Sequence, residues 1–169
     1  MQHLIALVLG HVDLWTALIA LTIGALKTRQ HWSRARWAES TLVSIAFWVM
    51  GLYGAYSFVM HLLFGDFIAA QIGWPNSPFQ YEVAYANLTI SILGFSTVWL
   101  RRRDYMVAAI VAYGSWIFAD GIGHVVSMVQ SGNTAEYNTG TILFTDLLMP
   151  LVAALLVWWS RHERREFQG

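Results

Sequence analysis

Long apolar runs are the feature that most constrains this chain. A helix needs about 20 apolar residues to cross the hydrocarbon core of a bilayer, and five segments reach or approach that length. They cover roughly residues 3–26, 40–64, 79–100, 105–129 and 138–160. The second and third contain an uncharged run of about the full length, whereas Asp13, Asp120 and Asp146 interrupt the other three. The pattern predicts an all-α transmembrane helical bundle with five spans, forming a single domain over residues 1–169.

Composition indicates lipid as the solvent around this bundle. Charged residues make up 12% of the chain, about half of the roughly 25% that is usual in soluble domains. Ten basic residues balance ten acidic ones, which argues against a nucleic-acid partner because such proteins carry an excess of positive charge. With no cysteine, the chain offers no thiolate for a zinc site, an iron–sulfur cluster or a nucleophile. The lipid bilayer is therefore the partner that composition predicts.

The Lys and Arg residues predict the orientation of the spans. All ten lie within residues 27–36, 101–103 and 161–165, whereas segments 65–78 and 130–137 contain none. Because cytoplasmic loops carry the excess of basic residues, five spans place the N-terminus outside and the C-terminus in the cytoplasm. We expect a multi-pass protein of the prokaryotic inner membrane. Its first span should be retained, since it lacks the basic start of a signal peptide.

Eight polar residues fall in the outer halves of the predicted spans. At 1.5 Å per residue they lie about 5 to 15 Å from the outer ends, and every span contributes at least one. Ionisable groups at this depth are costly if they face lipid, so they should face the bundle interior and find partners. We therefore expect a shared outward-facing pocket. Its residues are His11, Asp13, His61, Glu82, Asn87, Asp120, His124 and Asp146.

The chemistry of this set favours a divalent metal ion. The candidate ligands are Asp120, His124, Asp146, Glu82, His61, His11 and Asp13. Imidazole and carboxylate ligands suit Zn²⁺, Mn²⁺ or Fe²⁺. Asp120 and His124 are four residues apart, so they share one face of a helix, and Pro150 frees the backbone carbonyl of Asp146. No nucleophile elbow, P-loop or dinucleotide fingerprint is present, which leaves open whether the site is catalytic.

Two other functions fit the same residues. Carboxylates and histidines inside a membrane also build proton or cation relays, which predicts a coupled transport component, working as a homo-oligomer. The inner halves of the spans, however, hold Leu, Ile, Val, Ala and Trp and offer no obvious polar route. In the third interpretation the cluster only fixes helix packing or docks a partner, in a non-catalytic subunit of a membrane complex. Asp120 and His124 would then form a buried hydrogen-bonded pair.

Several short motifs resemble those of a known family. They are Ile72-Gly73-Trp74, Pro78-Phe79-Gln80, Glu82-Val83, Asn87-Leu88, Gly123-His124, Gly132-Asn133, Asn138-Thr139-Gly140, Asp146-Leu147-Leu148 and Pro150. Over roughly residues 40–160 the chain resembles a family of small prokaryotic integral membrane proteins with a four-helix core and unknown function. The resemblance implies no particular activity, and the first span departs from that pattern. It highlights the polar residues Glu82, Asn87, His124, Asn138 and Asp146.

Overall fold

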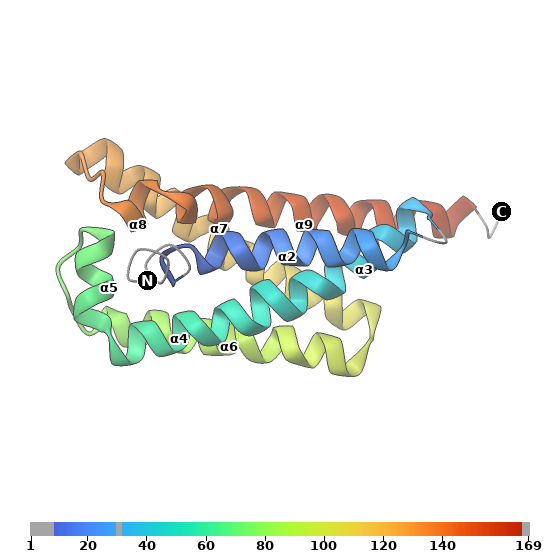
Figure 1. Cartoon of the computed structure of the whole chain (residues 1–169), viewed down its shortest axis with the longest axis horizontal. Coiled ribbons are helices and arrows are strands. Elements are labelled where there is room, and N and C mark those ends of the chain that lie inside the picture. Colours follow the sequence, from blue (N-terminus) through green and yellow to red (C-terminus); the bar gives the residue numbers. More distant parts are fainter. Residues whose placement is uncertain (1–8, 30–31, 167–169) are drawn as a thin grey trace.

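The regular structure of the described residues is helical throughout (Figure 1). The computed structural model describes residues 9–29 and 32–166, with side chains as far as Ser160. The elements are α2 (Val12–Lys27), α3 (Arg34–Ile45), the π-helical segment η1 (Ala46–Tyr53), α4 (Gly54–Leu63), α5 (Gly65–Ile72), α6 (Phe79–Leu100), α7 (Arg103–Ser131), α8 (Glu136–Thr139) and α9 (Thr141–Glu166). The all-α prediction is confirmed.

Four helices are long and apolar enough to cross a membrane. They are Arg34–Leu63, in which α3, η1 and α4 are continuous, Phe79–Leu100, Arg103–Ser131 and Glu136–Ser160. They correspond to the second to fifth predicted spans. The first predicted span overlaps α2, whose 16 residues cover about 24 Å at 1.5 Å per residue. Residues 3–8 of that span lie outside the described residues, so the described part of the chain shows four membrane-capable helices and the fifth crossing stays a prediction.

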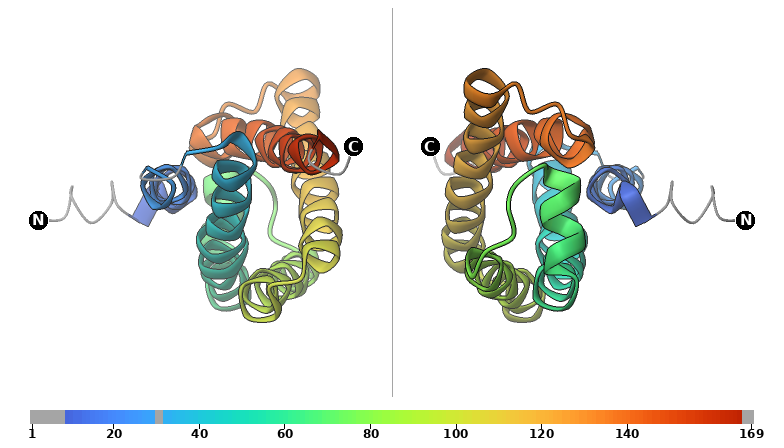
Figure 2. Two further views of the ribbon diagram at one scale, coloured as in Figure 1. Left: turned by 90° about the vertical axis from the view of Figure 1, so that its right-hand side faces the viewer. Right: turned by 90° about the vertical axis from the view of Figure 1, so that its left-hand side faces the viewer.

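The four long helices surround a common interior, and α2 lies at the side of the bundle (Figure 2). Helix α7 packs against α9, α6 packs against η1 and α4, and α3 packs against α9. Helix α2 contacts α3, η1 and α9. Large apolar side chains cover the outer surface, including Ile92, Val111 and Leu151, each more than half exposed. Such exposure is expected of helices that face lipid.

Glycines allow the closest helix crossings. A Cβ atom on Gly94 of α6 would meet the backbone oxygen of Ala46 and lie 2.6 Å from the backbone nitrogen of Gly51. A Cβ atom on Gly24 of α2 would lie 2.6 Å from the Cα of Thr41. Small residues at such crossings are a main determinant of helix packing in membranes, where burial in lipid supplies little driving force. The hydroxyl of Ser91 also donates to the Gly51 carbonyl at 2.8 Å, which joins α6 to η1.

The two ends of the bundle differ in chemistry. The described basic segments, residues 27–29, 34–36, 101–103 and 161–165, all fall at the end where α3 begins and α9 finishes (Figure 1). There Arg103 binds Glu39 at 3.0 Å and the hydroxyl of Ser160 at 2.8 Å, which ties α7 to α3 and α9. The opposite end carries α5 and α8. The basic segments therefore share one end of the bundle, and the cytoplasmic location of that end stays a prediction.

Candidate metal centre

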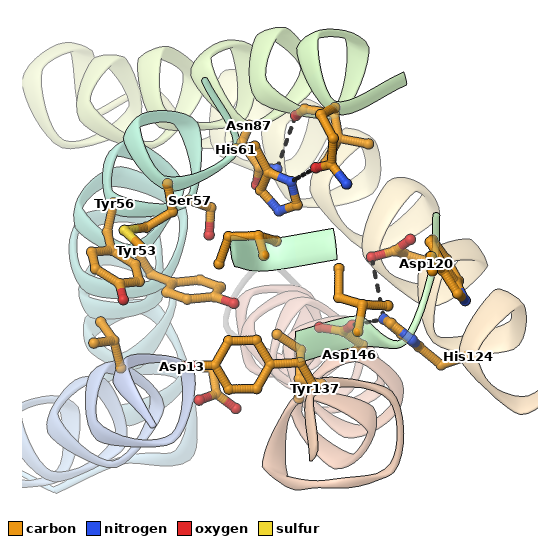
Figure 3. A pocket seen from close by; sticks show the side chains of 18 of the residues that line it. Asp13, Tyr53, Tyr56, Ser57, His61, Asn87, Asp120, His124, Tyr137 and Asp146 are labelled. Carbon is orange, nitrogen blue, oxygen red and sulfur yellow. Dashed lines mark hydrogen bonds and ion pairs between the residues drawn. The ribbon is translucent and has the colours of Figure 1, made fainter. Parts of the chain in front are cut away.

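A cavity of about 480 Å³ lies at the end of the bundle that carries α5 and α8. Its walls come from the start of α2, from η1 and α4, and from α5 to α9 (Figure 3). Seven of the eight residues expected to share a pocket line it: His11, Asp13, His61, Asn87, Asp120, His124 and Asp146. The buried apolar cluster, which includes Met50, Ile110, Met149 and Leu156, fills the interior towards the basic end.

Glu82 is the predicted pocket residue that does not line the cavity. It lies in the first turn of α6, at the expected depth, but its side chain is exposed. The face of α6 that points inward carries Gln80, Ala84 and Asn87, all buried. Two residues along a helix correspond to a rotation of about 200°, so Glu82 points away from the interior when Gln80 points into it.

Three side chains from α7 and α9 converge on one wall of the cavity. Nε2 of His124 lies 3.9 Å from Oδ2 of Asp120 and 3.9 Å from Oδ2 of Asp146. One ligand atom from each residue lies within 4.8 Å of the other two. A tetrahedral zinc ion holds such atoms about 3.3 Å apart, since each lies roughly 2.0–2.2 Å from the metal. Small side-chain rotations would therefore bring the three groups into coordinating positions.

Asp146 is the member of this group that most needs a partner. Its side chain is 4% exposed, and its Oδ2 atom has no hydrogen-bond partner within the described part of the chain. A buried carboxylate oxygen without a partner is strongly unfavourable. No Lys or Arg is found among the described residues that line the cavity. A bound cation would supply what the described side chains do not.

Asn138 fixes the orientation of the His124 ring. Nδ1 of His124 donates to Oδ1 of Asn138 at 2.9 Å, and the Asn138 amide donates to the backbone oxygens of His124 and Asn133. Trp74 stacks on the imidazole with ring centroids 5.6 Å apart. The Nδ1 hydrogen bond leaves the Nε2 lone pair facing Asp120 and Asp146. A hydrogen bond to the non-ligating nitrogen is the usual support of a metal-binding histidine.

Replacing Asn138 with Ala is expected to lower the free energy of unfolding by about 1–3 kcal/mol, because buried groups of His124 and Asn133 lose their partner. Asn138 has 0% exposure, so water does not replace it readily. Thermal unfolding in a mild detergent measures the loss. Gln130→Ala, at an exposed position on α7, is the matched control and should change little. Equal melting temperatures for the two variants would contradict the assigned role.

The three other candidate ligands that line the cavity, His11, Asp13 and His61, lie apart from this group. Nδ1 of His61 lies 2.6 Å from Oε1 of Gln80, between α4 and α6. Nδ1 of His11 lies 3.1 Å from the hydroxyl of Thr141, which donates to Asp13 at 3.3 Å. Among the described residues, the group with metal-ligand spacing consists of Asp120, His124 and Asp146. His11, Asp13 and His61 line the same cavity without joining that group, and Glu82 lies outside the cavity.

Several residues of the site are uncharged. The search for ionisable residues inside the predicted spans therefore did not identify them. Asn138 was indicated only by the family resemblance, and Trp74 only as part of a quoted motif. Tyr53, Tyr56 and Tyr137 line the cavity as well. Tyrosine and tryptophan are common throughout membrane proteins, particularly near the interface, so their types alone do not indicate a site.

Comparison with known proteins bears out the family resemblance. Residues 10–166 match the model of a family described as a family of unknown function, DUF6790. The matched range includes the whole cavity apart from Leu9. No curated protein and no solved structure matches the chain.

Proposed function

The chain belongs to the family of unknown function DUF6790, and we propose that it is an integral membrane protein that binds one divalent metal ion at Asp120, His124 and Asp146. The observation that carries this proposal is the buried Oδ2 atom of Asp146, which has no partner in the described part of the chain. It lies 3.9 Å from Nε2 of His124, whose lone pair is directed toward it. One cation would satisfy both atoms.

The charges of the three ligands suit a divalent ion. Two carboxylates, a neutral imidazole and a dication sum to zero, and a neutral site is far less costly in a membrane than an unpaired charge. One nitrogen and two oxygen donors favour Zn²⁺, Mn²⁺ or Fe²⁺. Three protein ligands leave at least one coordination position open, as in catalytic rather than structural zinc sites. The adjoining cavity of about 480 Å³ is large enough for a small molecule to reach that position.

Transport of the cation has less support. Between the cavity and the basic end, Ile110, Tyr113, Ile117 and Met149 belong to the buried apolar cluster. Among the described residues, the buried Asp, Glu, His, Lys and Arg side chains are those of Asp13, His124 and Asp146, all at the cavity. A proton or cation path would need further such groups toward the other end. We therefore propose a binding site open to one side, facing the exterior of a prokaryotic inner membrane.

Metal loading followed by X-ray absorption spectroscopy tests the proposal. The purified protein, loaded separately with Zn²⁺, Mn²⁺ and Fe²⁺ and then desalted, should retain about one equivalent of metal. The zinc spectrum should show nitrogen and oxygen donors near 2.0–2.2 Å, with a single imidazole. Asp66→Asn, at an exposed carboxylate outside the cavity, is the control and should load equally. Failure to retain any of the three ions, or a spectrum with two or more imidazoles, would overturn the assignment.

A further inference from the structure

We propose that Asp13, Tyr53, Tyr56 and Tyr137 form a second site in the same cavity, which binds a small organic ammonium ion. The four residues come from α2, η1, α4 and α8 and all line the cavity. None belongs to the group with metal-ligand spacing, which comes from α7 and α9. The proposal is therefore independent of the metal site.

Asp13 is a buried carboxylate whose described partners are neutral. Its side chain is 5% exposed, and it accepts hydrogen bonds from the hydroxyls of Thr141 at 3.3 Å and Thr145 at 3.1 Å. His11 contacts Thr141 rather than the carboxylate. Among the described residues, Asp13 takes part in no ion pair. Hydroxyl groups and the start of its own helix moderate the charge, but a buried carboxylate calls for a cation.

Three tyrosine side chains, those of Tyr53, Tyr56 and Tyr137, line the same cavity as this carboxylate. The rings of Tyr53 and Tyr56 stack with centroids 6.3 Å apart, and the Tyr56 hydroxyl donates to the backbone oxygen of Leu9 at 3.0 Å. Figure 3 shows Tyr53 pointing toward the centre of the cavity and Tyr137 beside Asp13. The Tyr56 hydroxyl thus ties α4 to the residues that precede α2.

A carboxylate among aromatic rings is the arrangement that recognises alkylammonium ions. The ring faces attract a cation, and the alkyl groups on its nitrogen pack against the same faces. An inorganic cation would instead need several oxygen ligands around it, whereas the part of the cavity that Asp13 shares with Tyr53, Tyr56 and Tyr137 also offers aromatic rings. No Lys or Arg lines the described cavity wall to repel such a ligand. The ammonium group could come from a free small molecule or from a lipid headgroup.

Calorimetric titration with choline and with 3,3-dimethylbutan-1-ol tests the site. The two molecules have the same shape, but only choline is charged. We expect metal-free protein in phosphatidylglycerol nanodiscs to bind choline at least about 10-fold more tightly than the alcohol, since only the cation is attracted by the carboxylate and ring faces. Equal affinities for the two probes, or no saturable choline binding, would overturn the proposal.

Substitutions separate this site from a merely structural role of the same residues. Asp13→Asn should weaken choline binding at least about 10-fold, and Tyr53→Leu about 3- to 30-fold. Tyr53→Phe keeps the ring face and should stay within about 3-fold of the wild type, while Asp66→Asn should have no effect. Thermal unfolding identifies any variant that does not fold. If folded Asp13→Asn binds choline as tightly as the wild type, the proposal is wrong.

Changing the lipid of the nanodiscs distinguishes the two sources of the ammonium group. In phosphatidylcholine nanodiscs with the same acyl chains, weaker binding of free choline would identify the headgroup as the occupant, and unchanged binding would identify a free ammonium compound. Measuring metal retention by the same samples tests the metal site separately from the ammonium site. Absent choline binding with metal retained overturns only the ammonium site, and absent metal with choline bound overturns only the proposed function.

Discussion

Asp146→Asn is expected to weaken divalent-metal binding by at least about 100-fold without destabilising the metal-free protein. Loss of supporting hydrogen bonds around a metal ligand typically costs 10- to 100-fold in affinity, and loss of a ligand itself should cost more. The metal-free wild type carries a buried carboxylate oxygen without a described partner. A neutral amide of the same shape removes that unfavourable charge, and after a small rotation it donates to Nε2 of His124.

The two opposite effects of this substitution make the prediction specific. Competition with a chelator of known affinity measures metal binding, and thermal unfolding of metal-free samples measures stability. The melting temperature of Asp146→Asn should equal or exceed that of the wild type. Asp66→Asn, an exposed carboxylate, should change neither quantity. A metal-free Asp146→Asn protein that melts well below the wild type would show that the carboxylate stabilises the fold directly and would contradict the metal assignment.

Gly94→Ala is expected to destabilise the bundle by about 1–3 kcal/mol or more, the range for overpacked sites. The added methyl group would meet the backbone of Ala46 and Gly51 and the Cβ of Met50. These atoms belong to the backbone and the buried core of η1, so they cannot move aside cheaply. Denaturation followed by tryptophan fluorescence, in a fixed mixture of mild and denaturing detergents, measures the change.

Gly123→Ala is the matched control for the crossing at Gly94. A Cβ atom there meets nothing within 4 Å, and alanine favours a helix over glycine by up to about 1 kcal/mol. The control should therefore be neutral or slightly stabilising. Similar losses in the two variants would mean that glycine flexibility, rather than close contact at Gly94, governs the stability of the bundle.

The sequence predicted that polar residues of several helices meet in one pocket because helices advance by a fixed rise per residue, and seven of the eight line one cavity. This rule is enough to place Asp13, Asp120 and Asp146 at one level and to bring them to one cavity. It says nothing about rotation around each helix axis, which depends on packing against neighbours. Glu82 therefore had the expected depth but points outward. The i, i+4 spacing of Asp120 and His124 was informative because it fixes their relative rotation.

Local irregularities also lay beyond what the sequence pattern predicts. The first span was predicted as one helix over residues 3–26, yet a turn at His11 precedes α2. The segment Ala46–Tyr53 is π-helical, although nothing in its composition distinguishes it from an α-helix. Asn138 takes its importance from two contacts, with His124 and Asn133, that form only after α8 packs on α7. Such features depend on tertiary contacts rather than on residue type.

The π-helical segment η1 changes the direction in which successive side chains point along the span Arg34–Leu63. Before it, Ala38, Leu42 and Ile45 face the apolar core; after it, Ser57 and His61 line the cavity. Each residue advances an α-helix by about 100°. If residues 46–53 were α-helical instead, the cavity-lining residues would therefore be rotated relative to the core-facing ones. The cavity is thus more sensitive to the length of η1 than to any one of its side chains. A single insertion or deletion in η1 rotates every following residue up to His61 about the helix axis, whereas a substitution leaves these orientations unchanged.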